Sequence, residues 1–141
     1  LPLLAPAIAH AQAWQPAGPI RLVVPFPAGG TTDILARLYA QRLSETLGAS
    51  VLVENRGGGG GSIGADVVAK APAYGTVLLF HNLTFSTTTA ALEFLGRAPH
   101  SIERDFAPIS LGANVPMMLL VHRDVPATDL RGFAAWAKAQ P

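Results

Sequence analysis

The stretch Ile20–Leu35 reads IRLVVPFPAGGTTDIL and decides the fold. Its start, through Val24, is a short apolar run typical of a strand buried on both faces. Two prolines then end the strand, and a glycine turn follows because glycine adopts backbone conformations closed to other residues. Thr31 or Thr32 can cap a helix after the turn, with Asp33 in its first turn. The stretch therefore predicts a strand, a turn without side chains and a helix start.

Such a turn before a helix is suited to binding an anion. Free backbone N–H groups converge there at the positive end of the helix dipole. The dipole favours an anion by roughly 0.3–1 kcal/mol, and by ~2 kcal/mol in a partly buried site. The turn can therefore orient a carboxylate but does not hold one tightly by itself. An ordinary strand–helix turn with a good cap remains the alternative.

Composition predicts a globular chain and argues against several kinds of site. The 141 residues are 50% hydrophobic and 13% charged, which suits one modest domain. The net charge of +1 comes without a basic stripe, which argues against nucleic-acid binding. No cysteine is present, so disulfides and thiolate metal sites are excluded. The histidines lack metal-ligand spacing, and we expect His100 and His122 at the surface.

The first 13 residues look like the end of a secretory signal peptide. A short apolar run, Leu1–Ala9, precedes the A-x-A pattern at Ala9-His10-Ala11 and again at Ala11-Gln12-Ala13. This pattern predicts a mature protein that works outside the cytoplasm, and a disordered leader is the alternative. The chain has no initiator Met, and it stops just after a predicted helix, Leu130–Gln140, so we expect it to be truncated at both ends.

Strands and helices are predicted to alternate along the first part of the chain. The predicted elements are strand Ile20–Val24, helix Thr32–Leu47, strand Ser50–Glu54, helix Ser62–Ala71 and strand Val77–Phe80. The apolar residues expected to form the buried face of the first helix are Ile34, Leu35, Leu38, Leu43 and Leu47. This order predicts an α/β fold with a parallel sheet. We predict two further strands, Phe106–Leu111 and Met117–Val121. The alternation of strands and helices changes near Gly112, between these two strands, which suggests that the chain crosses there into a second domain.

Ligands of parallel sheets bind beyond the carboxyl ends of the strands. Three predicted loops lie at that edge: Pro25–Thr32, Asn55–Ser62 and His81–Thr88. The second loop also matches two enzyme motifs. Gly59–Gly64 fits a dinucleotide-binding pattern, but the next strand lacks the acidic residue that would hold the ribose.

The same glycine run contains G-x-S-x-G around Ser62, and Asp105 and His122 follow in the order of an α/β hydrolase. A secreted hydrolase using Ser62 therefore stays open as an alternative function. Arg56 beside the run could bind or brace an anion, and it could equally pair with Glu54 or Asp33.

Three segments resemble the Bug receptors, the periplasmic solute-binding proteins of tripartite tricarboxylate transporters. They are Pro19–Leu35, Val51–Ala65 with the following Ala69–Ala73, and Asp105–Val121 with Val125–Ala127. The resemblance implies part of a type II periplasmic-binding-protein fold. Residues 1–13 would be the end of a signal peptide, 14–111 the N-terminal part of the first lobe, and 112–141 the hinge and the incomplete start of the second lobe. The family is roughly twice this long, a size expected for two domains.

The resemblance also implies function. It predicts a periplasmic, non-enzymatic receptor without a cofactor that captures a small organic carboxylate for cognate membrane transporter subunits. We expect a monomer, and a non-functional truncated remnant is a further alternative. The predicted ligand-binding residues are Phe26, Ala28, Gly29, Gly30, Thr31, Thr32 and Asp33, joined by Asn55, His81 and Asn82. For a plain dicarboxylate, Asp33 would serve the helix start instead of the ligand.

Overall fold

The computed structural model describes residues 14–116 and 118–140. The elements, in order, are β1 (Ile20–Val24), α1 (Thr31–Leu47), β2 (Val51–Asn55), η1 (Gly59–Gly61), α2 (Ser62–Ala69), β3 (Val77–Leu79), α3 (Thr84–Phe94), α4 (Ile102–Asp105) and α5 (Leu130–Lys138). The predicted signal-peptide segment, residues 1–13, lies outside the described residues. Each predicted strand and helix up to Leu79 is confirmed, and no end differs by more than two residues from its prediction.

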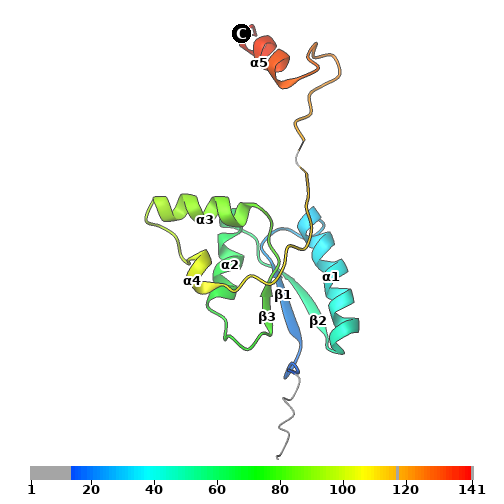
Figure 1. The fold of residues 1–141 in the computed structure, drawn as a ribbon, viewed down its shortest axis with the longest axis vertical. Coiled ribbons are helices and arrows are strands. Elements are labelled where there is room, and N and C mark those ends of the chain that lie inside the picture. The colour runs from blue at the N-terminus through cyan, green and yellow to red at the C-terminus, as the bar shows by residue number, and fades with distance from the viewer. Residues whose placement is uncertain (1–13, 117, 141) are drawn as a thin grey trace, which may run out of the picture. The chain divides into compact units, whose positions relative to one another are not determined.

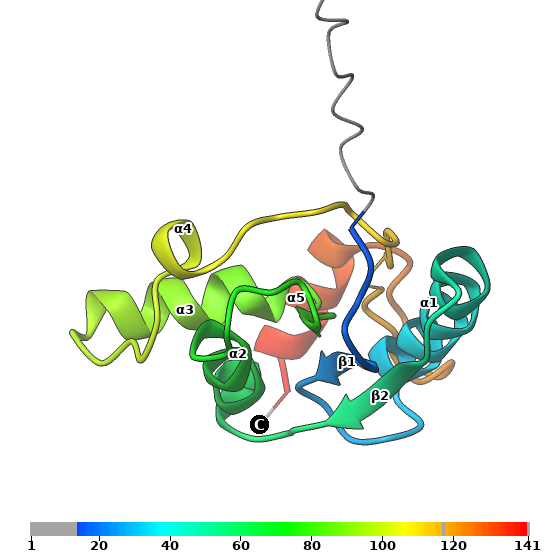
Figure 2. The same ribbon diagram turned by 90° about the horizontal axis from the view of Figure 1, so that it is seen from below.

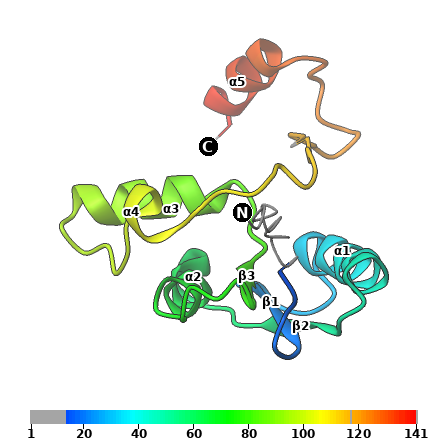
Figure 3. The same cartoon turned by 60° about the horizontal axis from the view of Figure 1, so that its bottom comes forward.

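The three strands form one parallel sheet in the order β2-β1-β3. Val24 pairs with Asn55 on one side of β1, and Val23 pairs with Leu79 on the other. The central strand β1 is buried at every position except Arg21, as its apolar run predicts. Figures 1 and 3 show the strands lying between α1 and α2. The predicted α/β fold with a parallel sheet is therefore confirmed.

Small residues bring both helices close to the sheet. Ala36 and Ala40 of α1 are buried in the core cluster with Ile20, Leu22, Val24 and Val51. The predicted leucine face of α1 is wrong in part, because Ile34 and Leu38 are 61% and 56% exposed. The first helix packs through its alanines, which allow the closer approach. Figure 2 shows α3 beside α2, and the two helices are in contact.

Two predicted strands are absent from the described residues. The segment between α4 and α5 has no regular secondary structure there, so the strand predicted at Phe106–Leu111 is wrong, and so is the described part, residues 118–121, of the one predicted at Met117–Val121. A strand is stable only when it pairs with another, and within the described residues these apolar runs have no paired neighbour. The predicted third loop, His81–Thr88, is partly helical because α3 begins at Thr84.

The chain divides into two compact units, with the break between Ala107 and Pro108. The first holds the sheet and α1–α4, and the second holds α5. The lobe boundary predicted near residue 112 stays a prediction. Within the described residues, none of the helices combines the length and the apolar character needed to cross a membrane.

Candidate functional site

The turn between β1 and α1 is held by Asp33. Gly30 occupies the N-cap with φ −74° and ψ 163°, and α1 begins at Thr31, so the predicted cap by Thr31 or Thr32 is wrong. The Asp33 carboxylate instead accepts a hydrogen bond from the backbone N–H of Gly29, with Oδ2 2.8 Å from the nitrogen. Gly29 has φ +84°, a conformation that favours glycine. The turn is therefore shaped from below by a buried carboxylate.

Asp33 is only 2% exposed, and both of its oxygens are engaged. Oδ2 also accepts from Nε of Arg37 at 2.9 Å, and Oδ1 accepts from Nδ2 of Asn55 at 2.9 Å. The bond from Arg37, followed by those from Gly29 and Asn55, holds the pKa of this carboxyl well below its usual range. Of the two roles predicted for Asp33, these contacts favour service to the helix start.

Asn55, the last residue of β2, ties the turn to the neighbouring strand. Its Nδ2 also donates to the carbonyl oxygen of Phe26 at 3.0 Å, and its Oδ1 accepts from Nη2 of Arg37 at 3.2 Å. Arg37 was not among the predicted site residues. The signal that could have found it is its spacing of four from Asp33, which places both side chains on one helix face.

Arg56 pairs with Glu54 and not with Asp33, which decides an alternative that the sequence left open. Glu54 also accepts from Arg21 across the sheet, at 2.7 Å from Nη2. The hydrogen bonds from Arg21 and Arg56 lower the pKa of the Glu54 carboxyl. The Arg56 side chain therefore pairs with a carboxylate of β2 that also binds Arg21 of β1.

The loop after β3 contacts the other two loops. Asn82 Nδ2 donates to Oγ1 of Thr32 at 3.3 Å. The His81 ring packs edge-on against Phe26, with centroids 5.1 Å apart, and its burial lowers its pKa. His81 also lies against Gly61, where an added Cβ would stand 2.4 Å from Nε2. The three predicted loops therefore meet at one edge of the sheet.

The exposed part of this edge is mostly backbone. Residues 28–31 and Asn82 are exposed, Phe26, Asn55 and His81 are half-buried, and Thr32 and Asp33 are buried. The first N–H groups of a helix lack acceptors within it, and α1 is 17 residues long. The surface thus presents N–H groups at the positive end of a long helix, with amide and imidazole groups nearby.

The three side chains of the hydrolase alternative each have a local partner. Ser62 Oγ donates to the Gly59 carbonyl at 2.8 Å. The Asp105 carboxylate accepts from the Ser101 N–H at 2.8 Å and from Arg104 Nε at 3.0 Å. His122 lies 3.3 Å from Asp124. Each of the three side chains is engaged with a near neighbour in sequence.

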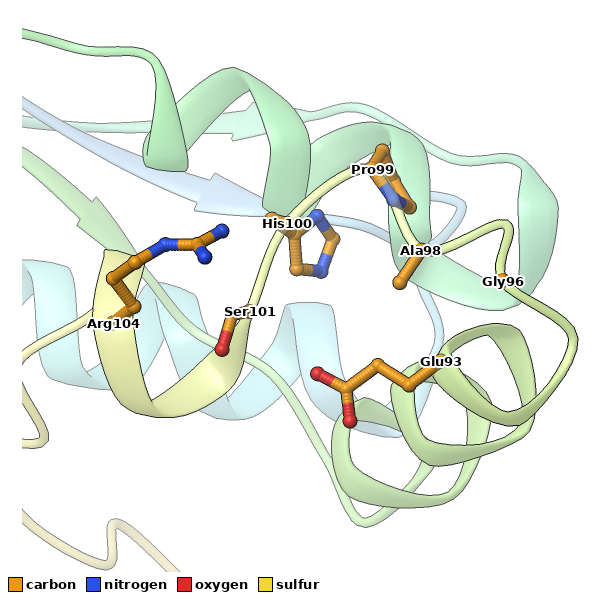
Figure 4. Close-up of a pocket in the computed structure, with 7 residues that line it drawn as sticks. All are labelled: Glu93, Gly96, Ala98, Pro99, His100, Ser101 and Arg104. Atoms are coloured by element: carbon orange, nitrogen blue, oxygen red, sulfur yellow. The ribbon is translucent and has the colours of Figure 1, made fainter.

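His100 is buried, so its predicted surface position is wrong. It is 3% exposed, packs against Phe85 and Phe106, and neither ring nitrogen has a hydrogen-bond partner. His122 is exposed as expected. His100 borders a hollow of about 350 Å³ between the end of α3 and α4, and Figure 4 shows Glu93 and Arg104 on either side of it. A second hollow, of about 410 Å³, lies between α1 and β2 and includes Arg37 in its lining.

The sequence model of the TctC family, described as tripartite tricarboxylate transporter family receptors, matches residues 35–141. The chain belongs to this family. Among its relatives, BugT of Bordetella pertussis is 37% identical over 126 residues, 89% of this chain and 38% of BugT. A UPF0065 protein from the ttuE–ttuC′ intergenic region of Agrobacterium vitis is 43% identical over 133 residues, 94% of this chain and 38% of that protein.

One solved structure extends the likeness to the fold. MatC of Rhodopseudomonas palustris, solved with bound malate, is 32% identical with a TM-score of 0.72 and covers 88% of this chain. This TctC-family chain therefore has part of the type II periplasmic-binding fold, as the resemblance implied. It corresponds to 42% of the MatC chain and to 37–42% of the length of the curated relatives it matches.

Proposed function

We propose that this chain is the ligand-capturing first lobe, residues 14–111, and the hinge with the start of the second lobe, residues 112–141, of a periplasmic receptor. The receptor binds a small organic carboxylate and delivers it to membrane subunits of a tripartite tricarboxylate transporter. It acts as a monomer, carries no cofactor and performs no chemistry. Family membership supports this function, and MatC, a relative in structure, was solved with malate.

The observation that carries the proposal is the meeting of three loops at the carboxyl edge of the parallel sheet. The turn at residues 28–31 is exposed, and the side chains beneath it are buried and hydrogen-bonded. A turn braced from below keeps its shape without a ligand, so little ordering entropy is lost on binding. This is the arrangement that suits a backbone anion site.

In this proposal the ligand carboxylate lies over the exposed turn. The N–H groups of Gly30 and Thr31 donate to it, and His81 and Asn82 supply further polar contacts from the third loop. The Gly30 N–H makes only a long bond to the Pro27 carbonyl, 3.4 Å, so it is available to a better acceptor. Tight binding also requires enclosure, because most of a small ligand's surface is buried in a good site.

A matched pair of variants at Gly30 tests the site. Its φ of −74° is compatible with proline, so Gly30→Pro removes the N–H donor with little change of φ. Gly30→Ala keeps the donor, and its Cβ meets only the Pro27 carbonyl at an ordinary 3.5 Å. We expect malate or a related dicarboxylate to raise the Tm of the full-length gene product and of Gly30→Ala. Gly30→Pro should lose this shift.

The control is the Tm of each variant without ligand, measured in the same thermal-shift assay. A Gly30→Pro variant that folds and keeps the full ligand-induced shift would place the site elsewhere. Wild-type protein that no carboxylate in the panel stabilises would contradict the function itself.

A further inference from the structure

Arg37 joins two elements of the candidate site without lying on its exposed turn. From α1 its Nε donates to Asp33 at 2.9 Å, and its Nη2 donates to the side-chain oxygen of Asn55 on β2 at 3.2 Å. Asn55 in turn donates to Asp33 and to the Phe26 carbonyl. The side chains of Asp33, Arg37 and Asn55 thus form a closed ring of hydrogen bonds under the turn. We call these three residues the bracing ring.

The charge of Asp33 is the difficulty that this ring has to overcome. Its carboxylate hydrogen-bonds directly to Gly29, one residue from the N–H groups proposed to receive a ligand carboxylate. Two negative charges this close repel each other, and a buried charge is poorly screened by solvent. Without a compensating cation, Asp33 would weaken the anion site that it shapes.

Arg37 is the compensating cation. It is 54% exposed while Asp33 is 2% exposed, and the two form an ion pair one helical turn apart. The other arginines near this edge, Arg21 and Arg56, both pair with Glu54. Within the described residues, Arg37 is therefore the cation that pairs with Asp33.

We propose that Arg37 is a positioning residue of the carboxylate site, which cancels the charge of Asp33 and locks the turn to β2. This inference rests on the proposed function and deepens it. It explains how one turn can be braced by a carboxylate and still accept a carboxylate. Arg37 itself does not touch the ligand in this account.

The experiment measures malate affinity by calorimetry in the full-length gene product for wild type, Arg37→Gln, Arg37→Lys and the double variant Asp33→Asn/Arg37→Gln. Arg37→Gln should weaken binding by about tenfold or more, because the Asp33 charge is left uncompensated. Arg37→Lys should recover part of the loss, since it keeps the charge without the fork that reaches both partners.

The double variant removes both charges, while the amide at position 33 keeps one oxygen that can accept from the Gly29 N–H. If Arg37 acts by cancelling charge, removing the Asp33 charge as well should restore most of the affinity lost in Arg37→Gln. A merely structural role would leave the double variant at least as weak as the single one. Such a result would overturn the inference.

Arg42→Gln is the matched control, because Arg42 lies on the same helix and its side chain pairs, among the described residues, with exposed Glu45 at 2.9 Å. It should bind malate like the wild type. If the wild type binds malate and Arg37→Gln binds it equally well, the role proposed for Arg37 is wrong, while the proposed function stands. Wild-type protein that binds no carboxylate would overturn the proposed function and this inference with it.

Discussion

At the residue scale, the site depends on side chains that are engaged beneath its surface. Asp33 holds the backbone of Gly29, and Asn55 holds that of Phe26, so two side chains set the path of the turn. The motif in the sequence predicted the turn and the importance of Asp33. The spacing of four between Asp33 and Arg37 is visible in the sequence, but the bond from Arg37 to Asn55 on β2 is not, because those two residues lie 18 positions apart.

His81 gives a pH-dependent prediction at the same scale. Its burial lowers its pKa from the ordinary value of 6.5. Above pH 6.5 the ring is neutral in both the folded and the unfolded chain and contributes no pH dependence. As the pH falls below 6.5, the unfolded chain binds the proton first, so the free energy of unfolding decreases until the folded pKa is reached.

We therefore expect the full-length gene product to lose stability between pH 6.5 and 5.5, by less than about 1.4 kcal/mol per pH unit from this one group. His81→Gln should remove that part of the slope, as measured by urea unfolding at several pH values. A wild-type slope equal to that of His81→Gln across this interval would contradict the prediction.

At the element scale, α2 packs on the first turn through a glycine. An added Cβ at Gly64 would stand 2.7 Å from the Arg56 carbonyl oxygen and 2.7 Å from Cβ of Pro25. Neither neighbour is the free end of a flexible side chain, so the helix would have to move away from the turn. Sequence periodicity located α2, but this close approach appears only when the helix is placed on the sheet.

Gly64→Ala should therefore destabilise the protein by about 1–3 kcal/mol through overpacking, less the gain of about 1 kcal/mol in helix propensity. Chemical unfolding of the variant measures the net loss. At Gly18 an added Cβ would have no heavy atom within 4 Å and φ is not positive, so Gly18→Ala should leave the free energy of unfolding nearly unchanged. Gly96→Ala has open space but a φ of +63°, so it measures backbone strain alone. Equal stability of Gly64→Ala and Gly18→Ala would mean that α2 does not pack as described.

At the scale of the whole molecule, the chain exposes much apolar surface. In the described part of the first unit, the most exposed large apolar side chain is Phe94, at 91%. The second unit exposes Leu111 at 83%, Ile109 at 82% and Met118 at 78%. Contiguous exposed apolar surface favours association. The chain also spans less than half the length of the relatives it matches.

We expect the 141-residue chain to bind an apolar fluorescent dye and to associate as its concentration rises. Dye titration and sedimentation velocity measure both effects. Leu111→Lys should reduce association if this surface drives it, whereas Arg123→Lys, at a 90% exposed charged position, should not. A monodisperse chain with weak dye binding would contradict the prediction.

The sequence by itself determined the parallel α/β arrangement, the turn that begins α1 and the family, because strand and helix periods and local turn chemistry are encoded by neighbours in the chain. The predictions that proved wrong concern residues whose structure depends on contacts with residues far away in the chain. The apolar runs after Phe106 have strand composition but no paired neighbour among the described residues, and His100 is buried by aromatic rings from α3 and the following chain. Only the tertiary structure decided that Arg37 of α1 reaches Asn55 of β2 and that Arg21 of β1 pairs with Glu54 of β2, because those contacts depend on which strand and helix lie side by side.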